Sequence, residues 1–234
     1  MTMCSMSEYD AWADVYDDWT GGADGDVAFY AELAREADGP IVELAVGTGR
    51  VAIAVARQTG KRILGLDSSA AMLDVARDKA RGVPVELRQA DMREFTLDEP
   101  AALVYVPGRS LLHLRGWQEK REVFRRVAAS LQPGGRFAFN CFVFVPRLAA
   151  ELDGVRQESG GVVHTSRYFA ADNRIEIERD DGATITLWWA TRAELEGLHD
   201  AAGLETEALF GSFDKRPFDD ESTEYVWVAR KPTA

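Results

Sequence analysis

The segment from Ile41 to Arg50 constrains the fold most, because it joins an apolar run to a glycine turn and then to the start of a helix. Gly47 and Gly49 permit backbone conformations that other residues avoid, and they let the chain approach a ligand closely. The N–H groups that open the following helix would point at that ligand. The spacing Gly47-x-Gly49-x-x-Ala52 also fits the dinucleotide fingerprint, so this turn indicates a nucleotide-like ligand without identifying it.

Three acidic residues narrow the range of ligands that the turn could bind. Glu43 lies on the first predicted strand, where a dinucleotide fold usually has an apolar residue, and its carboxylate would attract an amine or a sulfonium. Asp67 ends the apolar run 63–66 and could accept hydrogen bonds from both ribose hydroxyls of an adenosine. Asp91 and Met92 end a third predicted strand, and an adenine ring could be read there.

The order Glu-x-x-x-Gly-x-Gly, strand-end Asp and Asp-Met resembles the class I S-adenosylmethionine (SAM) dependent methyltransferases, and the resemblance covers nearly the whole chain. The pattern Tyr9-Asp10-x-x-Ala13-x-x-Tyr16-Asp17 is similar to the start of bacterial small-molecule methyltransferases, and Pro133-Gly134-Gly135 is a further match. Two positions depart from the family. Ala101-Ala102 stand where Asp or Glu is frequent, and Val46 replaces a small residue or cysteine.

This resemblance implies a set of cofactor contacts. Gly47 and Gly49 would flank the methionine part of SAM, Asp67 would hold the ribose, and Asp91 with Met92 would hold the adenine. The product would be S-adenosylhomocysteine, and no metal is expected, because the histidines and cysteines lack metal-ligand spacing. The residues expected to bind the cofactor are Tyr16, Glu43, Ala45, Gly47, Gly49, Arg50, Asp67, Ser68, Met72, Asp91, Met92 and Val106.

Apolar runs alternate with helical patterns from about residue 27 to residue 142, which is typical of βαβ units in a parallel sheet. We therefore expect an α/β fold with a doubly wound, Rossmann-like sheet of seven mostly parallel strands; by resemblance, the last strand is antiparallel. Strands are expected near residues 41–45, 62–66, 84–88, 102–106, 136–142, 205–210 and 224–230. Helices are expected near residues 27–34, 49–59, 69–80, 117–131 and 191–202.

The length of the chain fits one domain that covers residues 1–234. After Pro146 the pattern changes, because segments between residues 162 and 188 alternate polar and apolar side chains between turn residues. We expect residues from about 146 to 190 to form a small antiparallel β insertion over the active site, after the fifth strand. By resemblance, residues 1–35 form an N-terminal helical lid over the cofactor.

His113 is the candidate general base, because it follows the fourth predicted strand, at the edge where open α/β sheets bind ligands. A hydroxyl acceptor needs a base, whereas an amine must only arrive deprotonated. In the alternative reading, His113 caps the helix near Trp117 or forms a local hydrogen bond. Arg109 could bind an acidic substrate or pair with a surface carboxylate, and Arg109, His113 and Phe142 are the expected substrate contacts.

Composition restricts the possible partners. A formal net charge of −12, without a basic cluster, argues against nucleic acid, whose binding depends on phosphate contacts. No apolar run reaches the roughly 18 residues of a membrane span, and no signal-type core follows the N-terminus. We therefore expect a cytoplasmic monomer or homodimer that binds a small-molecule methyl acceptor and no membrane.

The sequence thus predicts a SAM-dependent methyltransferase that acts on nitrogen or oxygen of a small metabolite. The first alternative is an NAD-dependent oxidoreductase, which is disfavoured by Glu43, by Asp91-Met92 and by the lack of a Tyr-x-x-x-Lys pair. The second alternative is a non-enzymatic regulator that binds SAM or a nucleotide and uses the β insertion as a partner surface. Formation of a methylated product would exclude the regulator.

Overall fold

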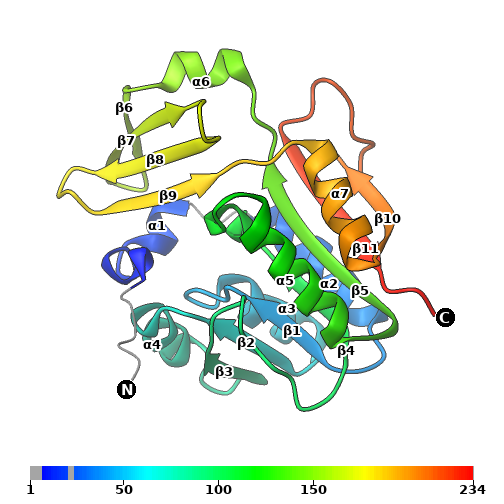
Figure 1. Ribbon diagram of the computed structural model, residues 1–234. Helices are drawn as coiled ribbons and strands as arrows, with labels where there is room; N and C mark the ends of the chain where they lie inside the picture. The colour runs from blue at the N-terminus through cyan, green and yellow to red at the C-terminus, as the bar shows by residue number, and fades with distance from the viewer. Residues whose placement is uncertain (1–6, 21–23, 234) are drawn as a thin grey trace.

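The computed structural model describes residues 7–20 and 24–233, which form an α/β fold around a seven-stranded sheet (Figure 1). Its strands are β1 Ile41–Leu44, β2 Ile63–Asp67, β3 Val85–Gln89, β4 Ala101–Val106, β5 Leu131–Phe142, β10 Glu205–Phe210 and β11 Glu224–Arg230. They lie in the order β10-β11-β5-β4-β1-β2-β3. The strands from β1 to β5 are parallel, and β11 is antiparallel to both of its neighbours. The predicted fold class and the antiparallel last strand are confirmed.

Helices cover both faces of this sheet (Figure 1). On one face, α2 (Asp24–Glu36) and α3 (Arg50–Thr59) bury their apolar residues, and α4 (Ala70–Lys79) lies beside β2 and β3. On the other face lie α5 (Gly116–Ser130) and α7 (Arg192–Ala202). Among the described residues, no helix is both long and apolar enough to cross a membrane. The carboxyl ends of the parallel strands meet at one edge, where a ligand site is expected.

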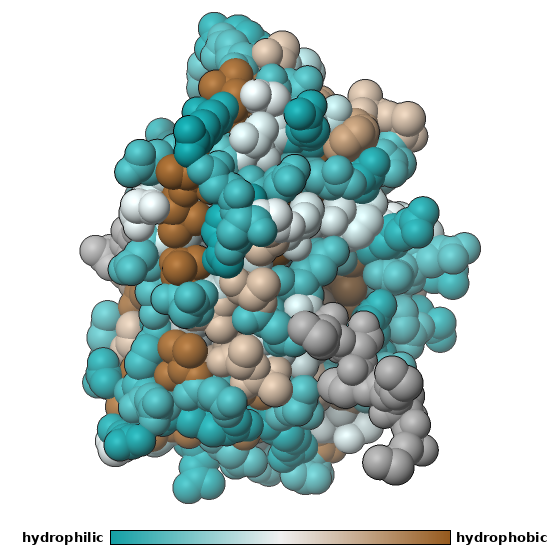
Figure 2. Space-filling view, turned by 90° about the vertical axis from the view of Figure 1, so that its left-hand side faces the viewer, coloured by the Kyte–Doolittle hydropathy of each residue, from teal (hydrophilic) through white to brown (hydrophobic). Residues whose placement is uncertain are grey.

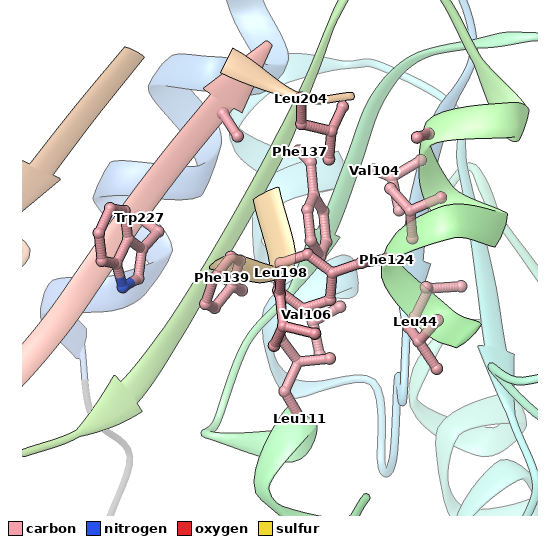
Figure 3. Close-up of a cluster of buried hydrophobic side chains, with 14 of the residues drawn as sticks. Leu44, Val104, Val106, Leu111, Phe124, Phe137, Phe139, Leu198, Leu204 and Trp227 are labelled. Carbon is pink, nitrogen blue, oxygen red and sulfur yellow. The ribbon is translucent and has the colours of Figure 1, made fainter. Parts of the chain in front are cut away.

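The core between the sheet and α5 combines aromatic rings with aliphatic side chains (Figure 3). Phe124 of α5 packs edge-to-face on Phe137 and Phe139 of β5, with ring centroids 5.2 and 5.4 Å apart. Truncation of one such buried ring to alanine typically costs about 3–5 kcal/mol. Val106, the last residue of β4, belongs to the same cluster and is fully buried. Its side chain is part of the core, and the contact of Val106 with the cofactor stays a prediction.

Strand β5 begins earlier than the sequence indicated. Pro133-Gly134-Gly135, expected before the strand, lie inside it, and the predicted helix near 117–131 ends at Ser130. A Cβ on Gly135 would lie 2.9 Å from the Ala101 carbonyl oxygen, and the β4–β5 register shifts between Ala101 and Leu103. The close approach of two backbones therefore needs glycine at this point, where the sequence looks like a loop.

A second sheet lies beside the main one (Figure 1). Its antiparallel strands run in the order β6 (Arg156–Ser159), β7 (Val162–Phe169), β8 (Arg174–Arg179) and β9 (Thr184–Trp188). The helix α6 (Pro146–Leu152) precedes it. Neither β6 nor α6 was predicted, whereas the antiparallel pairing of the later segments is confirmed. Figure 2 shows the side of the molecule that lies to the left in Figure 1. Hydrophilic side chains dominate this face, with apolar residues in a narrow strip between them.

The N-terminal segment lies between the two sheets and comprises η1 (Glu8–Ala11) and α1 (Tyr16–Thr20). Its fully buried Trp12 packs in a third apolar cluster with Met72 of α4 and with residues of the second sheet. The turn after β6 presses on α1 so closely that a Cβ on Gly160 would lie 1.8 Å from the carbonyl oxygen of Asp18. Residues 1–6 and 21–23 of the predicted lid lie outside the described residues.

Candidate active site

A cavity of about 320 Å³ opens at the carboxyl ends of β1 and β2, beneath the N-terminal segment. This volume lies within the range of roughly 300–1,000 Å³ that is usual for small-molecule sites. A hollow of about 500 Å³ along α5 and the loop before β4 contains none of the predicted site residues. The cavity is lined by Ser7, Glu8, Tyr9, Tyr16, Ala45, Gly47, Asp67, Ser68, Met72, Asp91, Met92, Arg93, Ser110 and His113.

The glycine turn forms one wall of the cavity. Ala45 has a φ of 56°, and such a conformation in a residue other than glycine is strained by about 1–3 kcal/mol and is typical of functional sites. Gly47 has a φ of 55°, and a Cβ there would meet no atom within 4 Å, so a side chain would extend into open space. Gly49 differs, because a Cβ there would lie 2.7 Å from Ile53 Cδ1. Its smallness serves the packing of α3, and it does not line the cavity.

Asp67 fixes this turn to the end of β2. Its two carboxylate oxygens accept hydrogen bonds from the N–H groups of Gly47, at 2.7 Å, and Ser69, at 2.8 Å. Burial raises the pKa of Asp67, and these backbone bonds offset only part of the rise. Because a carboxylate has about four acceptor positions, Asp67 keeps lone pairs that face the cavity. The sequence predicted its ligand role but not its structural one.

Asp91 lies at the opposite wall, where Arg93 holds it. The side-chain Nε of Arg93 lies 3.0 and 3.1 Å from the two carboxylate oxygens of Asp91. The backbone N–H of Arg93 donates to Asp91 Oδ1 at 2.8 Å. Burial alone would raise the pKa of Asp91, but the Arg93 hydrogen bonds outweigh burial and lower the pKa. The sequence did not identify Arg93, although it directly follows the Asp-Met pair.

Glu43 and Arg50 lie behind the glycine turn, outside the cavity lining. Glu43 is 1% exposed and pairs in register with Tyr105 of the adjacent strand. Burial raises the pKa of Glu43 to about 8, and its Oε2 has no hydrogen-bond partner among the described residues. Arg50 donates two hydrogen bonds to Asp26, at 2.9 and 2.5 Å. Neither side chain lines the cavity, and their contact with the cofactor stays a prediction.

The roof of the cavity is the N-terminal segment, which side chains fasten on several sides. Ser69 at the start of α4 donates to Asp10 at 2.5 Å, and Thr48 of the glycine turn donates to Asp17 at 2.6 Å. On the side of the second sheet, Glu8 accepts a 2.9 Å hydrogen bond from the N–H of Thr186. Tyr9 and Tyr16 therefore form a fixed aromatic wall, with ring centroids 5.7 Å apart.

His113 lines the cavity, but both of its ring nitrogens are occupied. Nδ1 lies 3.0 Å from the carbonyl oxygen of Thr186, and because a carbonyl only accepts, Nδ1 carries the hydrogen. Nε2 therefore accepts from the Tyr9 hydroxyl at 2.9 Å. Burial lowers the pKa of His113 to about 4, so the ring is neutral at pH 7.

Arg109 and Phe142 do not line the cavity. Arg109 forms a two-pronged ion pair with the buried Glu224, at 2.8 to 3.2 Å, and its guanidinium lies 5.8 Å from the centre of the Phe142 ring. Glu224 also accepts from Asn140 at 2.6 Å. Arg109 has a φ of 63°, so these contacts hold a strained turn just before the short helix η2 (Ser110–His113). The contact of Arg109 and Phe142 with the substrate stays a prediction.

Comparison with known proteins identifies the family. Residues 41–135 match a family model described as a methyltransferase domain. The chain is 31% identical to a dTDP-3-amino-3,6-dideoxy-alpha-D-glucopyranose N,N-dimethyltransferase of Streptomyces fradiae, over 73% of this chain and 72% of that protein. It is 27% identical to the cypemycin N-terminal methyltransferase of Streptomyces sp, over 84% and 85%. The solved CcbJ methyltransferase of Streptomyces caelestis has a TM-score of 0.83 and 29% identity, over 97% and 98%. The chain therefore belongs to the SAM-dependent methyltransferases, the enzyme family that its motifs resemble, and not to the NAD-dependent oxidoreductases.

Proposed function

We propose that this enzyme methylates the nitrogen of a small amine. The observation that carries the proposal is the state of His113, whose two ring nitrogens are both held in hydrogen bonds, to Tyr9 and to Thr186. An imidazole in this state has no free nitrogen with which to remove a proton from a hydroxyl acceptor. An amine that arrives neutral needs no base, so this cavity suits nitrogen better than oxygen.

The lining of the cavity fits SAM as the methyl donor. The open space above Gly47 leaves room for the methionine part, and the spare lone pairs of Asp67 suit a ribose. Asp91 and Met92 also line the cavity, and we assign the adenine to them. When bound, SAM supplies a methyl group on a positively charged sulfur that is a good leaving group.

The charges around the cavity favour a neutral or cationic acceptor. Glu8, Asp67 and Asp91 contribute carboxylates to the lining, and Arg93 is bound to Asp91. The formal net charge of −12 also disfavours anions at long range. We therefore infer a small uncharged or cationic metabolite as the substrate, and no nucleic acid.

The residues of this chain would contribute mainly by positioning. The Tyr9–His113 contact fixes one wall, and the roof fastened at Asp10 and Asp17 restricts the entry of water. Holding two reactants in the correct geometry can be worth roughly 7–11 kcal/mol in favourable cases. No charged side chain needs to take part in bond making for a neutral amine to react.

The test is a radiolabelled-SAM screen of matched small amines and alcohols, followed by pH profiles for the best acceptor. We expect methylation of amines, with kcat/KM rising as the pH approaches the pKa of the acceptor amine. The profile should show no enzyme inflection near pH 6.5, because burial lowers the pKa of His113 to about 4.

Faster methylation of an alcohol than of its matched amine would overturn the assignment to nitrogen. An enzyme inflection near pH 6.5 that disappears in His113→Gln would restore His113 as a general base. Methylation of nucleic acid alone would contradict the substrate class.

A further inference from the structure

Lys120 of α5 is a buried cation that the proposed function does not use. Its side chain is 3% exposed, and lysine is almost never buried to this degree without a charged partner. Among the described residues, no carboxylate lies within ion-pair distance of its Nζ atom. Its hydrogen-bond acceptor is the carbonyl oxygen of Leu114, at 2.5 Å.

Leu114 is the C-cap residue directly after η2, the short helix whose Ser110 and His113 line the cavity. The last carbonyls of a helix lack intrahelical partners and carry partial negative charge, so an ammonium there is well placed. The bond from Lys120 thus ties the end of η2 to α5, whose Phe124 is anchored in the core. His113 lies one residue before the carbonyl that is held.

A cavity of about 60 Å³ adjoins Lys120 between α5, α7 and the second sheet. Its other lining residues are Gly116, Trp117, Asp172, Asn173, Trp188, Trp189, Ala190, Glu194 and Leu198. Such a space admits one or two waters, which could satisfy the remaining ammonium hydrogens. Burial lowers the pKa of Lys120 to about 8, while Cys141 of β5, Glu194 of α7 and Glu119 of α5 act in the opposite direction.

We propose that Lys120 is a positioning residue for methyl transfer: its buried ammonium holds the Leu114 carbonyl and so fixes His113, and with it Tyr9, at the wall of the acceptor site. The charge of Lys120 also lowers the pKa of His113, in addition to the larger effect of burial. Lys120 thereby favours the neutral ring whose Nε2 accepts from Tyr9. The effect on turnover rests on the proposed function, whereas the effect on His113 does not.

The experiment compares Lys120→Met, Lys120→Arg and Arg121→Met with the wild type. Met removes the charge but fills similar space, and leaving the Leu114 carbonyl without its donor costs about 1–3 kcal/mol, which is less than the usual stability of a folded domain. Arg keeps a charged donor, and Arg121→Met removes an exposed cation from the same helix. The readouts are SAM affinity, kcat as a function of pH, and the tautomer and pKa of His113 by ¹⁵N NMR, assigned with His113→Gln.

We expect Lys120→Met to leave SAM affinity within about twofold and to lower kcat roughly five- to tenfold at pH 7, the order of one charge-assisted hydrogen bond. The ratio of wild-type to Lys120→Met kcat should fall towards one as the pH rises through about 8, because the wild type then loses the charge. This ratio cancels the titration of the acceptor. Lys120→Arg should recover part of the loss, and Arg121→Met should match the wild type.

The NMR readout separates the two proposals. If no amine is methylated, the proposed function fails, yet Lys120→Met should still raise the pKa of His113 and weaken its preference for the Nδ1–H form. A stable Lys120→Met protein with an unchanged His113 spectrum would overturn the positioning role. So would a kcat ratio above one that stays constant across the pH range.

Discussion

The two halves of the cavity wall are built in different ways. In the cofactor half, the Gly47 N–H meets Asp67 only 20 positions along the chain, and both lie at the carboxyl ends of the neighbouring parallel strands β1 and β2. In the roof half, Tyr9 meets His113 at a separation of 104 residues, and Glu8 meets Thr186 at a separation of 178. The first half depends on local backbone conformation, and the second depends on the docking of distant segments.

This difference predicts different consequences of mutation. Changes in the cofactor half should alter SAM affinity, because they reshape the backbone that the ligand touches. Changes in the roof should alter turnover more than affinity, because they move the walls around the acceptor. The following experiments test that distinction.

The largest effect is expected from a side chain at Gly47. Gly47 and Gly60 both have positive φ, at 55° and 68°, and at both a Cβ would meet no atom within 4 Å. Asn tolerates this conformation, so Gly47→Asn and Gly60→Asn carry similar backbone costs. We expect SAM affinity to fall about a hundredfold, or roughly 2.7 kcal/mol, for Gly47→Asn only. Calorimetry measures it, and equal affinities would place the cofactor elsewhere.

Asp67→Ala should have the next largest effect. It removes two charge-assisted hydrogen bonds from the N–H groups of Gly47 and Ser69, so stability should fall as well, by about 1.5–3 kcal/mol for each bond. SAM binding should weaken tens-fold or more. Urea unfolding and calorimetry measure the two effects. The matched control is the exposed Asp74→Ala, and an Asp67→Ala protein with normal affinity would show that Asp67 does not hold the ribose.

Tyr9→Phe tests the roof with a smaller change. It removes one neutral hydrogen bond to His113 and keeps the ring, so kcat should fall about three- to tenfold while SAM affinity changes less than twofold. Methyl-transfer assays measure kcat, and calorimetry measures the affinity for SAM. A loss confined to SAM affinity would contradict the division between the two halves.

The last prediction concerns stability against pH and leaves SAM affinity and turnover aside. Burial lowers the pKa of His113 to about 4 from an ordinary 6.5, so the unfolded chain binds more protons between these values. The contribution of His113 is therefore complete above pH 6.5 and is lost as the pH falls towards 4. His199 contributes to stability over the same pH range, because burial lowers the pKa of His199 to about 4. Urea unfolding of His113→Gln should show a weaker decline over this range than the wild type, and an unchanged decline would contradict the neutral ring.

Much of the main sheet could be predicted from the sequence, because its strands are apolar and glycine marks its turns. The predicted ranges 205–210 and 224–230 match β10 and β11 in both bounds. Where the pattern is polar, prediction failed. β6 is the edge strand Arg156–Ser159, which buries little. The helix α6 starts at Pro146, where the sequence pattern changes, because proline suits the first turn of a helix.

The site was predictable where it depends on local backbone and not where it depends on tertiary partners. Asp67 ends β2, Asp91 comes shortly after β3, and both line the cavity. Nothing near Arg109 reveals that Glu224, 115 residues away, occupies its guanidinium. Likewise, the occupied state of His113 depends on Tyr9 and Thr186, which only the folded chain brings together.

The contact at Gly160 limits how the second sheet could be exchanged. Because a single methyl group there would overlap the carbonyl oxygen of Asp18, the β6–β7 turn and α1 fit as one interlocked piece. A transplanted sheet with another acceptor preference would have to bring a glycine of positive φ, here 55°, to this point. Without it, the graft would push α1 outward and separate Asp17 from Thr48, so an engineered change of substrate would first loosen the roof and lower turnover.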